Sequence, residues 1–204
     1  IDLVWTQYKG HAAKIAQECV EKGCLNLVVF GGDGTLNEVV NGVFSSSIEN
    51  KSDTCIALVP YGTGNDWGRF WGITRNLKDS LSLLKTGKKK LVDVGKATLS
   101  GNTSYFLNAI GMGFDAEVIK VVSAIKNHLL SGGWIYSLAV FIAVFVHKSL
   151  KMSVFCDGKE VLNERVYTIS VGNGCYTGGG LKQTPDAVPN DEYFHVTVVK
   201  KLSF

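Results

Sequence analysis

Two short glycine-rich segments hold the residue types best suited to phosphate chemistry. The first, residues 31–35 (GGDGT), follows an apolar run at 27–30, and a helical pattern opens at Leu36. Because glycine lacks a Cβ atom, its backbone N–H groups can approach a phosphate closely, and a helix start adds unpaired N–H groups. The carboxylate of Asp33 would repel phosphates unless a Mg²⁺ ion or a hydroxyl lay between them. The segment therefore predicts a nucleotide phosphate site at which Asp33 contacts a metal ion or a hydroxyl group.

The second segment, residues 60–66 (PYGTGND), follows another apolar run, at 55–59. In a doubly wound parallel sheet, both loops would lie at the carboxyl ends of strands, where ligands bind. Thr63, Asn65 and Asp66 would then face the same cleft as Asp33.

Some of these side chains also have purely structural interpretations. Asp66 could be the N-cap of a helix that begins at Trp67, a role that does not exclude a second one. Thr35 could be only an N-cap, with Glu38 three residues later completing a capping box. For Thr35 the capping interpretation is the favoured one.

The elements that must position these loops alternate between strand and helix. Apolar runs predict three strands, at residues 2–6, 26–30 and 55–59. Helical periodicity predicts three helices, at residues 10–22, 36–44 and 76–85. This order favours a parallel sheet covered by helices.

The pattern changes after the basic run at residues 88–90, which is more typical of a solvated linker than of a phosphate or lipid patch. Strands are predicted at residues 91–99, 105–110, 152–156, 164–171 and 194–200. Asp157-Gly158 is a hairpin-turn signal. Two helical stretches, at 116–126 and 134–147, interrupt the strands. The second part is therefore strand-rich, and we expect its sheet to be antiparallel.

Composition narrows the classes of partner. The net charge of +3 is too small to imply nucleic acid, and 46% hydrophobic residues are enough for a substantial core. Five cysteines without a CxxC pair favour free thiols in a reducing cytosol over disulfides or a zinc site. The most apolar run, residues 134–146, is shorter than the ~18–20 residues that span a bilayer. It predicts a buried core helix or, alternatively, part of a wall that accepts acyl chains.

Glycine-rich or acidic clusters follow one another in a fixed order, namely 31–42 (GGDGTLNEVVNG), 60–66 (PYGTGND), 92–95 (VDVG), 108–117 (NAIGMGFDAE) and 172–191 (GNGCYTGGG and its acidic tail). Together they resemble the diacylglycerol kinase catalytic-domain family, which includes sphingosine kinase-like and bacterial diacylglycerol kinase-like lipid kinases. The resemblance covers almost the whole chain. GGDGT alone is shared with NAD kinases, whereas the later segments are typical of the lipid branch.

The resemblance implies an α/β Rossmann-like nucleotide lobe, residues 1–87, followed by a β-rich, β-sandwich-like lipid-substrate lobe, residues 88–204, with ATP between them. It also implies an incomplete fragment, which lacks the family's first strand and a C-terminal part. The family's general base is a glutamate that we expect beyond Phe204.

The resemblance further implies the residues of the active site. Asp33 and Asp66 would be catalytic acidic residues near the phosphates and the catalytic Mg²⁺ ion. The nucleotide would contact Thr6, Gly31, Gly32, Asp33, Gly34, Thr35, Leu36, Asn37, Gly62, Thr63 and Asn65.

A second, structural Mg²⁺ ion is implied in the β-rich lobe. Its ligands would be the carbonyl groups of Val188 and Tyr193 and the carboxylate of Asp191, and Asp93 would join through water. The chain departs from the family here, because Glu192 replaces a usual glycine and His195 a usual acidic residue.

The implied activity is that of an ATP-dependent lipid kinase, which transfers the γ-phosphoryl group of MgATP to a lipid hydroxyl, with diacylglycerol as the favoured acceptor. We expect a cytoplasmic protein in peripheral contact with a membrane, without a transmembrane segment or a nucleic-acid partner. A homodimer is compatible with the sequence. The fragment alone is expected to be inactive. The alternatives are an NAD kinase-like enzyme and a non-catalytic nucleotide- or lipid-binding module, which the missing general base favours.

Overall fold

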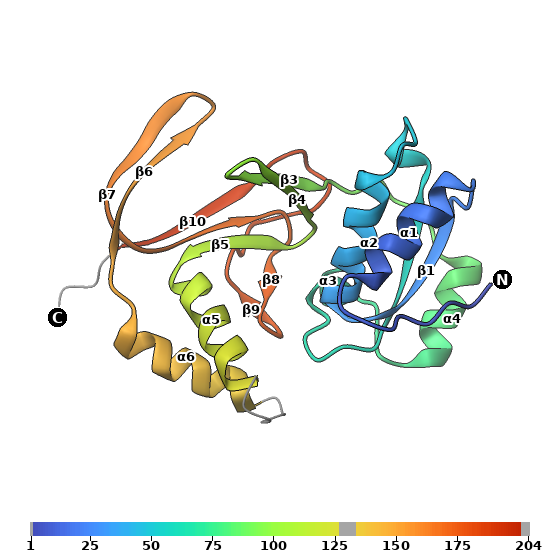
Figure 1. Ribbon diagram of the computed structural model, residues 1–204, viewed down its shortest axis with the longest axis horizontal. Coiled ribbons are helices and arrows are strands. Elements are labelled where there is room, and N and C mark those ends of the chain that lie inside the picture. The colour runs from blue at the N-terminus through green and yellow to red at the C-terminus, as the bar shows by residue number, and fades with distance from the viewer. Residues whose placement is uncertain (1, 127–133, 201–204) are drawn as a thin grey trace. The chain divides into compact units, whose positions relative to one another are not determined.

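The computed structural model describes residues 2–126 and 134–200 (Figure 1). The chain divides into two compact units. The first unit comprises Ile1–Ala109 and Asn173–Phe194, and the second comprises Ile110–Gly172 and His195–Phe204. The chain thus leaves the first unit after Ala109 and returns to it at Asn173. The domain boundary predicted after residue 87 stays a prediction. The two compact units instead meet at Ala109–Ile110, Gly172–Asn173 and Phe194–His195 along the chain.

The first unit contains the predicted parallel strands. β1 (Asn26–Gly31) pairs in parallel with β2 (Cys55–Pro60), and Gly31 lies opposite Pro60 in the register. Both glycine-rich loops therefore start at the same edge of the sheet, as the sequence predicts. The α/β class of this part of the chain is confirmed.

Two helices pack together on these strands. α1 (His11–Glu21) and α2 (Asp33–Ser45) lie side by side in Figure 1. A methyl group on Gly42 would collide with the carbonyl oxygen of Ala13, so a glycine in α2 allows the two backbones to approach. The core between helices and strands is formed by buried apolar side chains, among them Ala12, Ala16, Val20, Val29, Leu36, Val39, Val40, Val43 and Leu58.

The capping box predicted at Thr35 is wrong. α2 begins at Asp33, with Gly32 as its N-cap, so Thr35 lies inside the first helical turn. The carboxylate of Glu38 instead accepts hydrogen bonds from the N–H groups of Gly10 (2.9 Å) and Ala12 (3.3 Å), at the start of α1. Glu38 therefore caps the neighbouring helix.

The strand predicted at residues 2–6 is also wrong. This segment is irregular, and its apolar side chains are exposed, with Trp5 at 77%. A strand requires a neighbouring backbone to pair with, and apolar alternation alone cannot supply one.

The remaining elements of the first unit are short. They are η1 (Lys51–Asp53), α3 (Asp66–Phe70), α4 (Leu77–Thr86), β3 (Gly95–Leu99), β4 (Asn102–Phe106), β8 (Tyr176–Thr177) and β9 (Leu181–Lys182). β3 pairs with β4 and β8 with β9, both antiparallel.

The single strand predicted at residues 105–110 is divided between β4 and β5 (Ala109–Gly113). At the break, the carbonyl group of Leu107 accepts a hydrogen bond from the side chain of Asn173 (2.7 Å). The carbonyl group of Asn108 accepts the N–H groups of Asn173 and Gly174, both at 2.7 Å. These bonds to the returning segment replace the ladder that would have continued the strand.

The second unit is built around an antiparallel sheet. β7 (Lys159–Gly172) pairs with β6 (Leu150–Cys156) and with β10 (His195–Lys200), and β5 lies on the path β10-β7-β5. The predicted turn between β6 and β7 is confirmed, because Asp157 and Gly158 both have positive φ (49° and 78°), as hairpin turns of this kind require.

Two helices belong to the same unit. α5 (Phe114–Lys126) and α6 (Trp134–Val146) pack through Val118, Ala139 and Ala143. α6 is not the fully buried core helix favoured by the sequence, since Phe141 is 63% exposed. Over residues 2–126 and 134–200, no helix combines the length and the apolar character needed to cross a bilayer.

Candidate functional site

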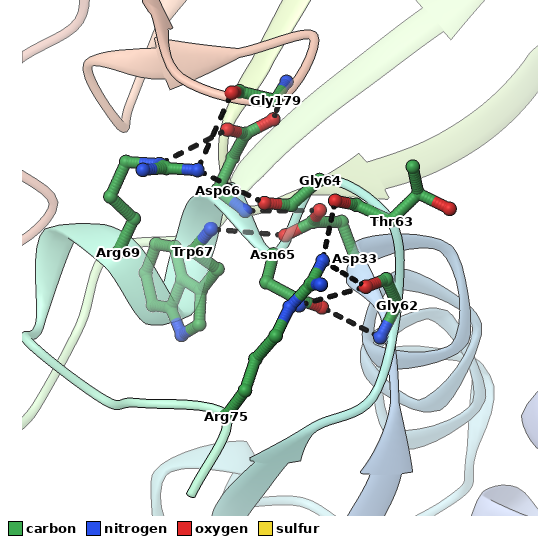
Figure 2. Close-up of polar contacts among 10 residues, drawn as sticks. All are labelled: Asp33, Gly62, Thr63, Gly64, Asn65, Asp66, Trp67, Arg69, Arg75 and Gly179. Atoms are coloured by element: carbon green, nitrogen blue, oxygen red, sulfur yellow. Dashed lines mark hydrogen bonds and ion pairs between the residues drawn. The ribbon is translucent and has the colours of Figure 1, made fainter. Parts of the chain in front are cut away.

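Asp33 joins the two glycine-rich loops. It is the first residue of α2, and its carboxylate accepts the backbone N–H groups of Asp66 and Trp67, each at 3.0 Å (Figure 2). These N–H groups belong to the first turn of α3, which no residue of its own chain segment caps through a side chain. Asp33 thereby fixes the 60–66 loop against the start of α2.

The glycines of the two loops permit this contact. A methyl group on Gly32 would lie 2.8 Å from the Cα atom of Gly62, and one on Gly62 would collide with the Cα atom of Gly32. Neither position can carry a side chain without separating the loops. Close packing of backbone on backbone is therefore one reason for these glycines, in addition to any role with phosphates.

Asp66 is almost entirely buried, at 5% exposure. The N-cap interpretation is wrong for this residue, because Asn65 (φ 50°) occupies the N-cap and Asp66 is the first residue of α3. Its Oδ2 atom accepts the N–H group of Gly179 at 2.9 Å. Its Oδ1 atom has no hydrogen-bond partner among the described residues, and the Nε atom of Arg69 lies 3.8 Å from it.

Burial raises the pKa of the Asp66 carboxyl group, and the negative charge of Asp33 raises it further, whereas the Gly179 N–H group opposes both effects. A buried carboxylate with one orphaned oxygen is energetically unfavourable unless a cation or a donor completes its shell. The environment of Asp66 therefore favours an additional positive partner.

The two carboxylates border one point in space. A methyl group on Gly64 would lie 3.1 Å from Oδ2 of Asp33 and 3.2 Å from Oδ2 of Asp66. Paired carboxylate oxygens are suitable ligands for Mg²⁺, which usually takes one or two carboxylates and keeps several waters. Within the described part of the chain, no group of three or more His, Cys, Asp and Glu side chains is arranged as a complete metal site.

The 60–66 loop is held by two side chains of its own neighbourhood. Asn65 accepts the N–H group of Gly62 through Oδ1 (2.8 Å) and donates to the Gly62 carbonyl group through Nδ2 (2.9 Å). Arg75 donates through Nη2 to the carbonyl groups of Gly62 (2.6 Å) and Thr63 (2.7 Å), as Figure 2 shows. Asn65 was predicted to face the nucleotide, but these hydrogen bonds of its side chain go to the loop itself.

The other predicted nucleotide contacts occupy varied positions. Gly34 is exposed, and a methyl group there would meet open space. The side chain of Leu36 is in the core, so only its backbone is available to a ligand. Thr6 lies in the exposed segment before α1, and Thr63 is exposed on its loop. Gly31 is buried, while Thr35 and Asn37 are half-buried in the first turns of α2.

The contacts of three residues at this site were not predicted from the sequence. Arg75 gives no sequence signal, since it is one of several cations in a polar stretch. Arg69 could have been found from its position three residues after Asp66, on the same helix face. Gly179 belongs to the glycine-rich segment 172–191, but its bond to Asp66 could not have been predicted, because 113 residues separate the two.

The residues predicted for a structural Mg²⁺ ion are also brought together, but in the first compact unit. Asp93 accepts the N–H group of Glu192 (2.8 Å), and Asp191 accepts that of Tyr193 (3.0 Å). The carbonyl group of Val188 accepts the N–H group of Asn190 (2.9 Å). An open recess adjoins them, lined by Asp93, Val94, Glu192, Tyr193 and Phe194.

The backbone conformation at Glu192 explains why a glycine is usual at this position of the turn. Its φ is 66°, in the left-handed region that disfavours residues with a Cβ atom. The chain adopts the turn in spite of the substitution, at the expense of backbone strain.

Comparison with known proteins agrees with this arrangement. Residues 1–97 match the family model of the diacylglycerol kinase catalytic domain. Residues 108–204 match that of the YegS C-terminal NAD kinase beta sandwich-like domain. The two matches together cover nearly all of the chain.

Individual relatives agree as well. A protein of Chromohalobacter salexigens named "Probable lipid kinase YegS-like" is 29% identical over 95% of this chain and 60% of its own length. A diacylglycerol kinase of Staphylococcus aureus is 28% identical over 96% of this chain and 59% of its own length. A solved structure of a diacylglycerol kinase from Bacillus anthracis has a TM-score of 0.70 at 27% identity, over 97% of this chain and 61% of that one.

The chain thus spans about three fifths of the length of the relatives it matches. It belongs to the diacylglycerol kinase catalytic-domain family, in the form that carries a YegS-type C-terminal domain.

Proposed function

We propose that the intact protein is an ATP-dependent lipid kinase, which transfers the γ-phosphoryl group of MgATP to a lipid hydroxyl. The observation that carries this proposal is the meeting of the Asp33 and Asp66 carboxylates beside two glycine-rich loops at one edge of a parallel sheet. Phosphoryl transfer needs mainly positioning and neutralisation of charge, and this arrangement is suited to both.

The two carboxylates would have different duties. Asp66 would be a ligand of the catalytic Mg²⁺ ion, since its Oδ1 atom is buried without a hydrogen-bond partner. Asp33 would hold the 60–66 loop in place through the two N–H groups of α3 and offer its remaining lone pairs to the metal or its waters. When bound, Mg²⁺ supplies neutralisation of the charge on the transferring phosphoryl group.

The nucleotide phosphates would lie against the two loops. The exposed backbone at Gly34 offers close approach without steric hindrance. Side-chain contacts would come from Thr63, Thr35, Asn37 and Thr6, with Gly31, Gly32, Gly62, Leu36 and Asn65 contributing backbone or loop geometry. The general base is assigned to no residue of this chain.

The second cluster would hold a structural Mg²⁺ ion. The carboxylates of Asp191 and Asp93 and the carbonyl groups of Val188 and Tyr193 supply oxygen atoms only, which suits this cation. The ion would stabilise the turn at Glu192, whose backbone is strained.

The acceptor would be a lipid, with diacylglycerol favoured because relatives bear that name. α6 supports an apolar ligand or a membrane surface, since it carries no charged residue and exposes Phe141 and Val144. A helix that is apolar all round is expected to be covered by protein or by lipid. Peripheral membrane contact in the cytoplasm follows as part of the same proposal.

The test follows transfer of labelled phosphate from MgATP by the full-length protein. Mixed micelles would present diacylglycerol, ceramide, sphingosine or phosphatidylglycerol, with NAD⁺ as a soluble control. Transfer to one lipid supports the proposal and names the acceptor, and we expect Asp66→Asn to abolish it.

Transfer to NAD⁺ would instead indicate an NAD kinase-like enzyme. Binding of ATP without transfer to any acceptor would contradict the proposal and favour a binding module.

A further inference from the structure

Arg75 binds two consecutive peptide groups of the 60–66 loop with one nitrogen atom. Its Nη2 atom donates to the carbonyl oxygens of Gly62 at 2.6 Å and of Thr63 at 2.7 Å (Figure 2). Hydrogen bonds from a guanidinium group are charge-assisted and stronger than neutral ones. Arg75 therefore fixes which way these two peptide planes face.

The orientation of the carbonyl groups decides that of the neighbouring N–H groups. In a trans peptide the C=O and N–H groups point in opposite directions, and the chain has no cis peptide bond among its described residues. With both carbonyl groups turned to Arg75, the N–H groups of Thr63 and Gly64 face away from it. Within residues 2–126 and 134–200, neither N–H group has a hydrogen-bond acceptor.

Two successive N–H groups that face one side form a concave site for an anion. A flexible glycine loop can turn either the N–H or the C=O side of a peptide toward a ligand. Such a site therefore needs a hydrogen-bond donor that keeps its carbonyl groups turned away from the ligand. Arg75 holds both carbonyl groups, whereas Asn65 holds only that of Gly62, so Arg75 draws the negative ends of both peptide dipoles to its own side.

We infer that Arg75 is a positioning residue, which presents the N–H groups of Thr63 and Gly64 to the phosphate chain of the nucleotide. The inference rests on the proposed use of ATP and deepens it. Arg75 acts through the loop and does not itself touch the substrate.

A simpler explanation would be long-range attraction, by which any cation near the site helps to bind ATP. Lys78 distinguishes the two. It is exposed and lies three residues from Arg75, and in the described part of the chain its side chain makes no hydrogen bond to the loop. Lys78→Gln removes one positive charge, as Arg75→Gln does, without freeing the carbonyl groups.

The experiment measures steady-state kinetics with MgATP on the full-length protein, and competition by inorganic tripolyphosphate. Because Arg75 acts on the nucleotide only through the loop, the expected effect is that of one ordinary hydrogen bond, about a 3- to 10-fold weakening. We expect Arg75→Gln to raise the KM for ATP and the inhibition constant of tripolyphosphate by that common factor, with kcat within about twofold of the parent. Arg75→Lys should recover part of the loss, and Lys78→Gln should match the parent.

Three results would overturn the inference. They are an unchanged KM in Arg75→Gln, an equal rise in Lys78→Gln, and a fall in kcat that accompanies unfolding at lower temperature. If the parent protein transfers no phosphate at all, the proposed function fails instead. Direct binding of tripolyphosphate to the parent and to Arg75→Gln then still tests the inference, since equal affinities would refute it.

Discussion

The replacement of Asp33 by asparagine should destabilise the fold, apart from any effect on catalysis. Each oxygen of Asp33 accepts one backbone N–H group of α3, and asparagine can accept only one of them. A hydrogen bond to a charged group contributes about 1.5–3 kcal/mol, and the negative charge at the helix start adds about 0.3–1 kcal/mol. Because Asp33 is half-buried, we expect a loss of about 2–3 kcal/mol in the free energy of unfolding.

Asp66→Asn should behave differently, although both residues are motif aspartates. Burial raises the pKa of Asp66, so the folded state binds its proton more tightly than the unfolded state does. The stability that this provides is complete below the unfolded-state pKa and is lost as the pH rises through the folded-state pKa. Above the folded-state pKa the ionised, desolvated carboxylate therefore weakens the fold, and asparagine removes that cost while keeping an acceptor for Gly179.

The assay is urea unfolding of the full-length protein at neutral pH without Mg²⁺, followed by tryptophan fluorescence. Trp67 is a local reporter, because it is buried and its N–H group is one of the two that Asp33 accepts. We expect Asp33→Asn to unfold at lower urea, and Asp66→Asn to match or exceed the parent. Equal stability of Asp33→Asn and the parent, or equal losses in the two variants, would refute this reasoning.

Further substitutions test the loops and the strained turn. Gly62→Ala should cost about 1–3 kcal/mol, measured by thermal unfolding, because its methyl group collides with Gly32; a stable variant would mean that the loops are not in contact. Gly34→Ala should raise stability by up to about 1 kcal/mol through helix propensity while weakening ATP binding in a titration, and undiminished affinity would argue against close phosphate approach there. Glu192→Gly should gain up to about 1 kcal/mol in urea unfolding by relieving its left-handed backbone, without loss of the bond to Asp93; lower stability would show that the turn is not strained.

The sequence was most informative where a local pattern determines the structure. Apolar runs identified β1 and β2, and turn residues identified the Asp157-Gly158 hairpin. The alternation of strands and helices predicted a parallel sheet, which places both loops at one sheet edge. The strand expected at residues 2–6 failed because pairing depends on a partner strand, which the pattern of one segment does not reveal.

The functional loops show the same limit. That Asp33 and Asp66 belong together followed from the order of the strands, but their individual environments did not. Asp33 caps a helix that begins 33 residues later, and Glu38 caps one that ends before it, so neither matches a local capping rule. The buried state of Asp66 depends on Gly179, and only the folded chain brings that residue near.

The return of residues 173–194 to the first unit has a consequence for synthesis of the chain on the ribosome. The N–H group that Asp66 accepts follows it by 113 residues. At typical elongation rates of about 5–20 residues per second, roughly 6–23 s pass before that donor exists. During this interval the nascent α/β segment has both glycine-rich loops but lacks Gly179, which donates to Asp66. Residues Ile110–Gly172 of the second unit must be synthesised first. The environment of Asp66 is therefore completed late in translation, and a ribosome that stalls before residue 179 leaves this carboxylate without the Gly179 N–H group.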